Sequence, residues 1–170
     1  MRKPDLRYEF AQRWFERGSA EGNPFDAFFY LWIALIIAAR HAMQREPEDA
    51  DLKTIKDYFK LHMGDILRVV SAEDERMKQL RVRRGTEGGN IVEAYGHQKV
   101  RRRQLFYEYA VAYDDLPNSK KVETLAEIIN QVRNNLFHGR KVYDDVKDRE
   151  LLELVNPLLR SILVGVEGFK

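Results

Sequence analysis

The feature that most constrains the fold of this chain is a run of thirteen uncharged, mostly apolar residues, AFFYLWIALIIAA, from Ala27 to Ala39. Asp26 precedes the run and Arg40 follows it. It is shorter than the ~18 residues that indicate a membrane span. As a helix it would be apolar on nearly every side, which is typical of a helix buried on all sides. We therefore expect a core helix at the centre of a bundle and no membrane segment.

Elsewhere apolar residues recur at helical spacing, and no convincing pair of strands is present. The sequence predicts an all-α bundle of about five to six helices in a single domain, residues 1–170. The glycine-rich segment 85–96 is expected to be an irregular loop, in which a short strand at Ile91-Val92 remains open. The expected helical segments are 5–17, 24–44, a region from 51 that Gly64 interrupts, 97–113, 118–136 and 148–166.

Local signals refine three of these helices. Leu6, Phe10 and Trp14 share one side of the first helix and are expected to face the core. Residues 18–22, with the sequence GSAEG, predict its end. Asn23 followed by a proline predicts the capped start of the second helix. Pro157 lies inside the last apolar pattern, so we expect a kink or a break there.

The chain contains no cysteine, which excludes disulfides, thiolate metal sites and a cysteine nucleophile. Its first residues, Met1-Arg2-Lys3-Pro4-Asp5, lack the apolar stretch of a secretory signal. Both observations suit a cytoplasmic protein. No histidine accompanies the carboxylates at 46, 48, 49 and 51 at ligand spacing, so we predict neither a metal nor another cofactor.

Positive charge is concentrated in one segment. The whole chain has a formal charge of +2, whereas residues 81–103 hold seven Lys or Arg against two Glu, a net +5. Such a stripe can bind the phosphate backbone of RNA, and an equally open interpretation is a solvated helix face. The candidate RNA-binding residues here and later in the chain are Arg81, Arg83, Arg84, Lys99, Arg101, Arg102, Arg103, Arg140 and Lys141.

The strongest chemical signal closes the helix expected at 118–136. Arg133, Asn134 and His138 are polar residues near its end, and Gly139 follows them. In an ideal helix Arg133 and His138 are about 140° apart, so they meet at one phosphate only if the last turn loosens. A histidine can move a proton at neutral pH, and an arginine can hold a phosphate with its planar fork.

The pattern Arg133-Asn134, three residues, then His138-Gly139 resembles the R-x4-6-H motif of the HEPN superfamily, and Leu31-Trp32-Ile33-Ala34 is similar to its first core helix. The likeness covers about residues 24–166. It implies a helical bundle, often dimeric, and a metal-independent endoribonuclease in which two motifs meet across the dimer. It implies a phosphate contact for Arg133, proton transfer for His138 and support for Asn134.

The resemblance also implies a role in toxin–antitoxin systems or antiviral defence, with a possible antitoxin or regulatory partner. One toxin branch has Tyr two residues after the histidine, as a site for nucleotide addition by its antitoxin. This chain has Arg140 there, so that form of neutralisation is not implied.

Three alternatives stay open at this point. The chain can be a non-catalytic HEPN-like module that binds RNA or protein, or an unrelated helical bundle with a ligand or assembly role. Arg133 and His138 can also serve only to complement the negative end of a helix. His41, His62 and His97 are expected to be structural or surface residues.

Overall fold

The computed structural model of the chain describes residues 6–77, 79, 113–137 and 146–170. These residues form six α-helices and one short 3-10 helix, and no strand occurs among them. The expected all-α class is therefore confirmed, with slightly more helices than the five to six predicted. The elements are α1 (Leu6–Ala20), α2 (Pro24–Met43), α3 (Asp51–Leu61), α4 (Met63–Ala72), η1 (Tyr113–Asp115), α8 (Asn118–Phe137) and α9 (Val146–Glu167).

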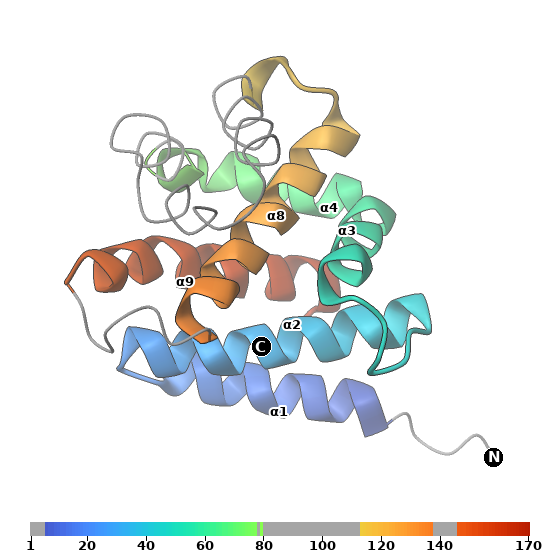
Figure 1. Ribbon diagram of the computed structural model, residues 1–170, viewed down its shortest axis with the longest axis vertical. Helices are drawn as coiled ribbons and strands as arrows, with labels where there is room; N and C mark the ends of the chain where they lie inside the picture. Colours follow the sequence, from blue (N-terminus) through green and yellow to red (C-terminus); the bar gives the residue numbers. More distant parts are fainter. Residues whose placement is uncertain (1–5, 78, 80–112, 138–145) are drawn as a thin grey trace.

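Helix α2 lies between α1 and the remaining helices (Figure 1), and it packs against α1, α9 and α3. Its buried residues include Phe28, Leu31 and Leu35, none of which is accessible to solvent. By length and apolarity alone α2 could cross a membrane, but 56% of its most apolar window is buried inside the molecule. The burial agrees with the core helix expected from the sequence.

The ends of α2 follow from local chemistry. The side chain of Asn23 accepts hydrogen bonds from the backbone N–H groups of Phe25 and Asp26, at 2.9 and 3.5 Å. Pro24 occupies the first helical position, where its missing N–H costs nothing. At the other end Gln44 adopts a left-handed conformation with φ of 50° and closes the helix. The predicted boundaries of this helix are thus confirmed.

The prediction for α1 was wrong in two respects. The helix does not end at Gly18 but continues to Ala20, and its buried side consists of Ala11, Phe15 and Gly18. Leu6 and Phe10, expected in the core, are 58% and 48% exposed. The reason is steric: Gly18 has no side chain, so α1 lies close to Leu31 of α2 at this point. This close contact rotates the other apolar stripe of α1 toward solvent.

Two later boundaries also differ from expectation. The region from Asp51 is interrupted at His62, which separates α3 from α4, and not at Gly64, which lies inside α4. Helix α9 continues through Pro157, which rules out the break that was one of the two expected outcomes there, while the other, a kink, stays a prediction. Next to this proline, the Asn156 amide donates a 2.9 Å hydrogen bond to the carbonyl oxygen of Pro24, which joins α9 to the start of α2. The loop predicted at 85–96 lies outside the described residues, as does the helix predicted at 97–113 except for Tyr113, which begins η1.

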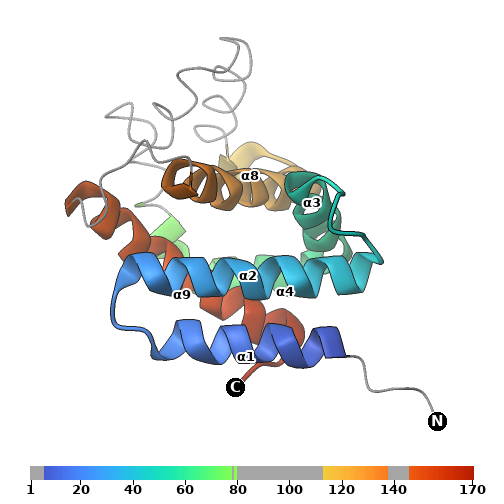
Figure 2. The ribbon, with the colours of Figure 1, turned by 60° about the horizontal axis from the view of Figure 1, so that its bottom comes forward.

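Helix α8 runs across the bundle next to α3 and α4, and its last turn lies over the first half of α2 (Figures 1 and 2). Its apolar side, which includes Leu125, Ile129 and Val132, is fully buried or nearly so. The helix spans Asn118–Phe137, as the 3.6-residue period predicted. The core packing of α8 therefore fixes where its polar end, with Arg133 and Asn134, is placed.

Ion pairs join α8 to α3 along their length. Lys56 of α3 pairs with Glu127 of α8, and Lys60 pairs with Glu123. Lys120, one turn before Glu123, lies 2.9 Å from the same carboxylate. Burial by itself raises the pKa of the Glu123 carboxyl, but the hydrogen bonds from Lys60 and Lys120 outweigh it and hold that pKa below its ordinary value of 4.5.

The C-terminal end is anchored by Tyr58 of α3. Its side chain is fully buried, and its hydroxyl donates a hydrogen bond to the Glu167 carboxylate at the end of α9. Burial and this neighbouring carboxylate raise the pKa of Tyr58 far above its ordinary range, so the phenol stays protonated. Phe169 then packs against Phe15 of α1, with ring centroids 5.2 Å apart.

Gly18→Ala tests the close contact of α1 with α2. A Cβ at this position would lie 2.8 Å from Cγ of Leu31 and 3.1 Å from its backbone nitrogen. Although alanine favours helices, we expect this overpacking to lower the free energy of unfolding by about 1–2 kcal/mol in denaturant titrations. Gly64→Ala in α4 is the control, because nothing lies within 4 Å of its Cβ position. Equal stability of the two variants would contradict the steric explanation.

The lowered pKa of Glu123 makes a prediction about pH. Because the folded protein binds this proton more weakly than the unfolded chain, the ionised carboxylate stabilises the fold above pH 4.5, and this contribution is lost as the pH falls through the folded-state pKa. We expect Glu123→Gln to cost about 1 kcal/mol at neutral pH and little at acid pH. Glu48→Gln, at an exposed loop position, should have little effect at either pH.

Candidate functional site

The described part of the R-x4-H motif lies in the last two turns of α8. Nη1 of Arg133 donates a 2.9 Å hydrogen bond to Oδ1 of Asn134. The side chain of Arg133 is 29% exposed, so part of it can reach a ligand. Of the three residues expected to carry the chemistry, the structure thus brings these two together. His138 lies outside the described residues, and its placement relative to Arg133 stays a prediction.

Two aromatic rings hold the Arg133 guanidinium. Its Cζ atom lies 5.6 Å from the centroid of the Trp32 ring and 5.2 Å from that of Phe137. Trp32 belongs to the buried side of α2 and is 3% exposed, whereas Phe137 is 40% exposed. Cation–π contact of this kind is favourable and restricts the guanidinium to one side of the helix. Arg133 therefore rests on the bundle core and does not extend freely into solvent.

A carboxylate lies on another side of Arg133. Oδ2 of Asp51, the first residue of α3, is 3.6 Å from Nη2 of Arg133, and Oδ1 of Asp51 is 2.6 Å from Nη2 of Arg40. Arg40 also donates a 3.0 Å hydrogen bond to the carbonyl oxygen of Pro47. Two guanidinium groups thus share one carboxylate, which leaves the three side chains with a net charge of +1.

Neither arginine is fully satisfied by these contacts. Nε of Arg40 and Nε of Arg133 are both buried and have no hydrogen-bond acceptor in the part of the chain that is described. The Arg133–Asp51 contact also lacks the paired, short geometry of a strong arginine–carboxylate interaction. Because its contact with Asp51 is long and its side chain is partly exposed, Arg133 retains capacity for a further anion, although its buried Nε does not contribute to it. Arg40 is the closer partner of Asp51.

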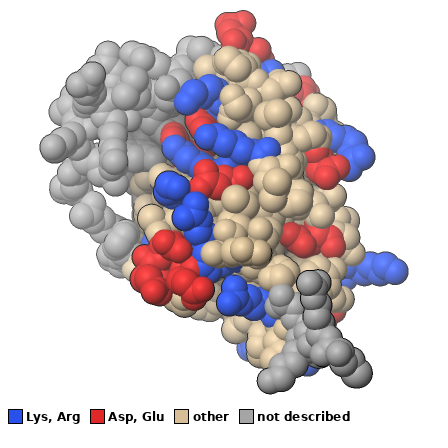
Figure 3. Space-filling model, turned by 90° about the vertical axis from the view of Figure 1, so that its right-hand side faces the viewer, with Lys and Arg blue, Asp and Glu red and all other residues tan. Residues whose placement is uncertain are grey.

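The Arg133–Asp51 pair extends the row of ion pairs between α3 and α8. Because the two helices are antiparallel, residues 60, 56 and 51 face residues 123, 127 and 133 in turn. In the first two pairs α3 supplies the lysine and α8 the glutamate, and in the third the signs are reversed. Acidic and basic side chains are accordingly interleaved on the face that carries α3 (Figure 3). The reversal places the cation of α8 at its C-terminal end.

The sequence did not single out several residues that shape this site. Trp32 was expected only as part of the buried apolar run, and Arg40 only marked the end of that run. Phe137 was given no role. Asp51 stood in the sequence only among four nearby carboxylates that do not predict a metal site, whereas it is the carboxylate between two arginines. The sequence does place the acidic Asp51 at the start of one expected helix and the basic Arg133 near the end of another. Only antiparallel packing of these two helices brings the opposite charges together.

The other candidate residues divide into two groups. All nine predicted RNA-binding residues, which are the seven basic residues of 81–103 together with Arg140 and Lys141, lie outside the described residues, as does His97. His62 separates α3 from α4, and its ring lies 4.9 Å from that of Tyr58. Within the described segments, no group of three His, Asp or Glu is arranged to hold a metal ion.

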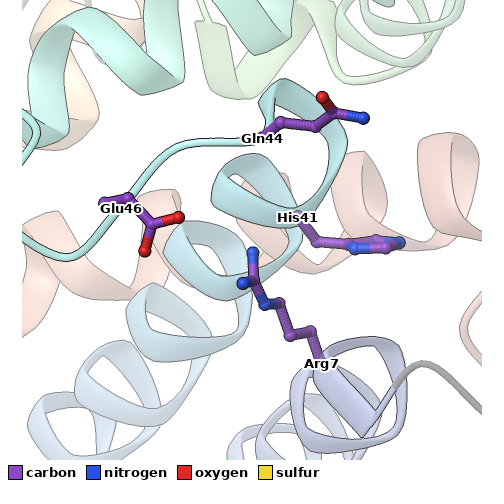
Figure 4. Close-up of a pocket in the computed structure, with 4 residues that line it drawn as sticks. All are labelled: Arg7, His41, Gln44 and Glu46. Atoms are coloured by element: carbon purple, nitrogen blue, oxygen red, sulfur yellow. The ribbon is translucent and has the colours of Figure 1, made fainter. Parts of the chain in front are cut away.

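A separate hollow of about 420 Å³ lies where α1 meets the end of α2 (Figure 4). Arg7 extends into it from α1, His41 and Gln44 come from the end of α2, and Glu46 comes from the loop that follows. The hollow is lined by polar side chains, and neither Arg133 nor Asn134, the predicted site residues that the structure describes, is among them. It therefore adds nothing to the site at the end of α8.

Comparison with known proteins leaves the family open: no protein-family model, curated protein or solved structure matches the chain.

A double-mutant cycle tests how firmly Asp51 engages each arginine. We expect a coupling energy of about 1 kcal/mol between Asp51→Asn and Arg40→Gln, whose groups are 2.6 Å apart, and a smaller one between Asp51→Asn and Arg133→Gln at 3.6 Å. The measurement is the free energy of unfolding of the single and double variants. Stronger coupling to Arg133 would identify it as a structural ion pair with little capacity for a ligand.

Proposed function

We propose that this chain is a metal-independent endoribonuclease of the HEPN type, in which Arg133 and His138 cleave RNA with support from Asn134. The observation that carries the proposal is the way in which the Arg133 guanidinium is held in place while part of the side chain stays exposed. Its guanidinium is held against Trp32 and Phe137, is hydrogen-bonded to Asn134 and remains partly exposed. A cation fixed in this way can stabilise charge that develops on a phosphate without reorganising first.

The chemistry needs a proton acceptor, a cation and a proton donor. The ribose 2′-hydroxyl attacks the adjacent phosphorus and loses its proton to a base, a role that we assign to His138. The P–O5′ bond then breaks, and the departing oxygen takes up a proton. The products are a 2′,3′-cyclic phosphate and a 5′-hydroxyl. Histidine suits proton transfer near neutral pH, and arginine stabilises the crowded phosphoryl oxygens.

At the C-terminal end of α8, more than one cation is needed to bind a phosphate. The carbonyl end of a helix carries partial negative charge and by itself disfavours a phosphate. Arg133 opposes this charge from within the last turns, and Arg140 and Lys141 follow closely in the sequence. We propose that these residues, with the basic residues of segment 81–103, hold the RNA backbone.

One motif supplies one histidine, whereas the reaction uses a base and an acid. We therefore propose a homodimer in which two motifs meet to form a composite site, as the HEPN resemblance implies. By the same resemblance, the activity belongs to a cytoplasmic toxin or antiphage defence system with a possible antitoxin or regulatory partner. No cofactor takes part in this scheme.

The second candidate function is a non-catalytic HEPN-like module that binds RNA or protein. The contact between Arg133 and Asp51 favours it, because a neutralised arginine is a weaker catalyst.

The deciding experiment is cleavage of a mixed single-stranded RNA in excess EDTA. We expect wild type to generate 2′,3′-cyclic phosphate ends, and His138→Ala to lose about 10²–10⁴-fold in rate. Arg133→Gln should lose about 10²–10³-fold, because the neutral amide cannot stabilise the phosphoryl charge. Arg68→Gln, which removes the same charge from an exposed position on α4, is the matched control and should cleave normally.

Circular dichroism and thermal melting would show that each variant is folded. Cleavage by His138→Ala at the wild-type rate, or activity that disappears in EDTA, would contradict the proposal. RNA binding with no cleavage by any folded protein would favour the non-catalytic module.

A further inference from the structure

Four aromatic rings form a continuous row across the surfaces of α1, α2 and the end of α8. Trp14 stacks on Tyr30 with centroids 5.6 Å apart and an interplanar angle of 27°. Tyr30 contacts Phe29 at 5.7 Å, and Phe29 contacts Phe137 at 5.5 Å, both edge to face. We call these residues, Trp14, Tyr30, Phe29 and Phe137, the aromatic row.

The row is accessible to solvent along its length. Phe29 and Phe137 are 41% and 40% exposed, and Trp14 and Tyr30 are partly exposed. Scattered exposed rings are ordinary, but rings in contact with one another form a patch, and such patches mark binding surfaces. The buried side of α1, with Ala11, Phe15 and Gly18, packs on α2, while Trp14 is only partly buried against the core.

An arginine lies at each end of the row. Cζ of Arg17 is 4.7 Å from the Tyr30 centroid and 5.9 Å from that of Trp14, while Arg133 lies over Phe137 at 5.2 Å. The same pairing continues one turn earlier along α1, where Arg13 lies 6.0 Å from the ring of Phe10, itself 48% exposed. Positive charge therefore accompanies the rings.

This combination is specific for a class of ligand. Flat aromatic faces stack on nucleobases of any sequence, and the arginines complement the phosphates that join those bases. A duplex hides its base faces by stacking, so the row fits an unpaired strand. Protein interfaces are also enriched in aromatic residues and arginine, so a contact between copies of the chain is the alternative that the test below separates.

We propose that the aromatic row is a stacking platform for single-stranded nucleic acid, which leads the strand to Arg133. The inference rests on the proposed function, because the strand is led to the proposed catalytic site. Arg133 belongs to that site and also lies at one end of the row. It adds that the substrate is unpaired RNA and that its bases are held by contacts that do not read sequence.

The test uses an oligonucleotide that the proposed reaction cannot cleave. A fluorescein-labelled single strand of roughly a dozen 2′-deoxynucleotides lacks the attacking hydroxyl, so binding to the full chain can be followed by fluorescence anisotropy without cleavage. We expect Phe29→Ala and Trp14→Ala to weaken binding by about five-fold or more. The labelled duplex of the same sequence should show no such dependence.

Two further variants separate stacking from general apolar contact. Phe29→Tyr keeps the ring and should bind as wild type, whereas Phe29→Leu keeps the apolar bulk and should bind as weakly as the alanine variant. Leu61→Ala is the control for loss of an exposed apolar side chain, because Leu61 is 61% exposed and lies on α3, away from the row. Thermal melting would confirm that each protein is folded.

Wild-type binding by Phe29→Ala or Phe29→Leu would overturn the proposal. So would sedimentation in which Phe29→Ala converts a dimer to a monomer while binding of the single strand is unchanged, because the row would then be a contact between copies. Row-dependent binding without RNA cleavage in EDTA would support the platform and contradict the proposed enzyme. RNA cleavage in EDTA at the wild-type rate by Phe29→Ala, with unchanged binding of the single strand, would support the proposed enzyme and contradict the platform.

Discussion

The burial of α2 is the constraint on which the rest of the structure depends. A helix that is apolar on most of its circumference must be covered on several sides, and α1, α9 and α3 provide that cover. Gly18 lets α1 lie close to Leu31, and the side chain of Asn156 bonds α9 to the start of α2. Burial of large side chains such as Phe28 and Leu31 contributes about 2–3 kcal/mol each. The positions of the surrounding helices follow from it.

Helix α8 is fixed by two kinds of contact. Its apolar side joins the core, and its ion pairs with α3 set which residues of the two helices face each other. Such partly exposed pairs add little stability individually, but the reversal of charge at the third pair favours one register over others. In that register Arg133 faces Asp51 and lies over Trp32. The position of the proposed catalytic arginine is thus a consequence of packing many residues away from it.

The site at the end of α8 and the aromatic row share Arg133 and Phe137. Phe137 contacts both the guanidinium of Arg133 and the ring of Phe29. A strand that stacks on the row would therefore lie next to the cation that we assign to the phosphate. This continuity connects recognition to chemistry in one physical arrangement, and it joins α8 to the consecutive helices α1 and α2, which lie far from it in the sequence.

The sequence by itself determined the helical class, the central place of α2, and the extent of α2 and α8. Periodicity, an Asn-Pro cap and an uncharged apolar run are local signals that need no partner to be interpreted. It also singled out Arg133 and Asn134. Only the tertiary structure decided which stripe of α1 is buried, because both stripes are apolar and the choice depends on how closely Gly18 can approach Leu31. It likewise placed Asp51 and Trp32 next to Arg133, since contacts between helices distant in sequence leave no local trace in either one.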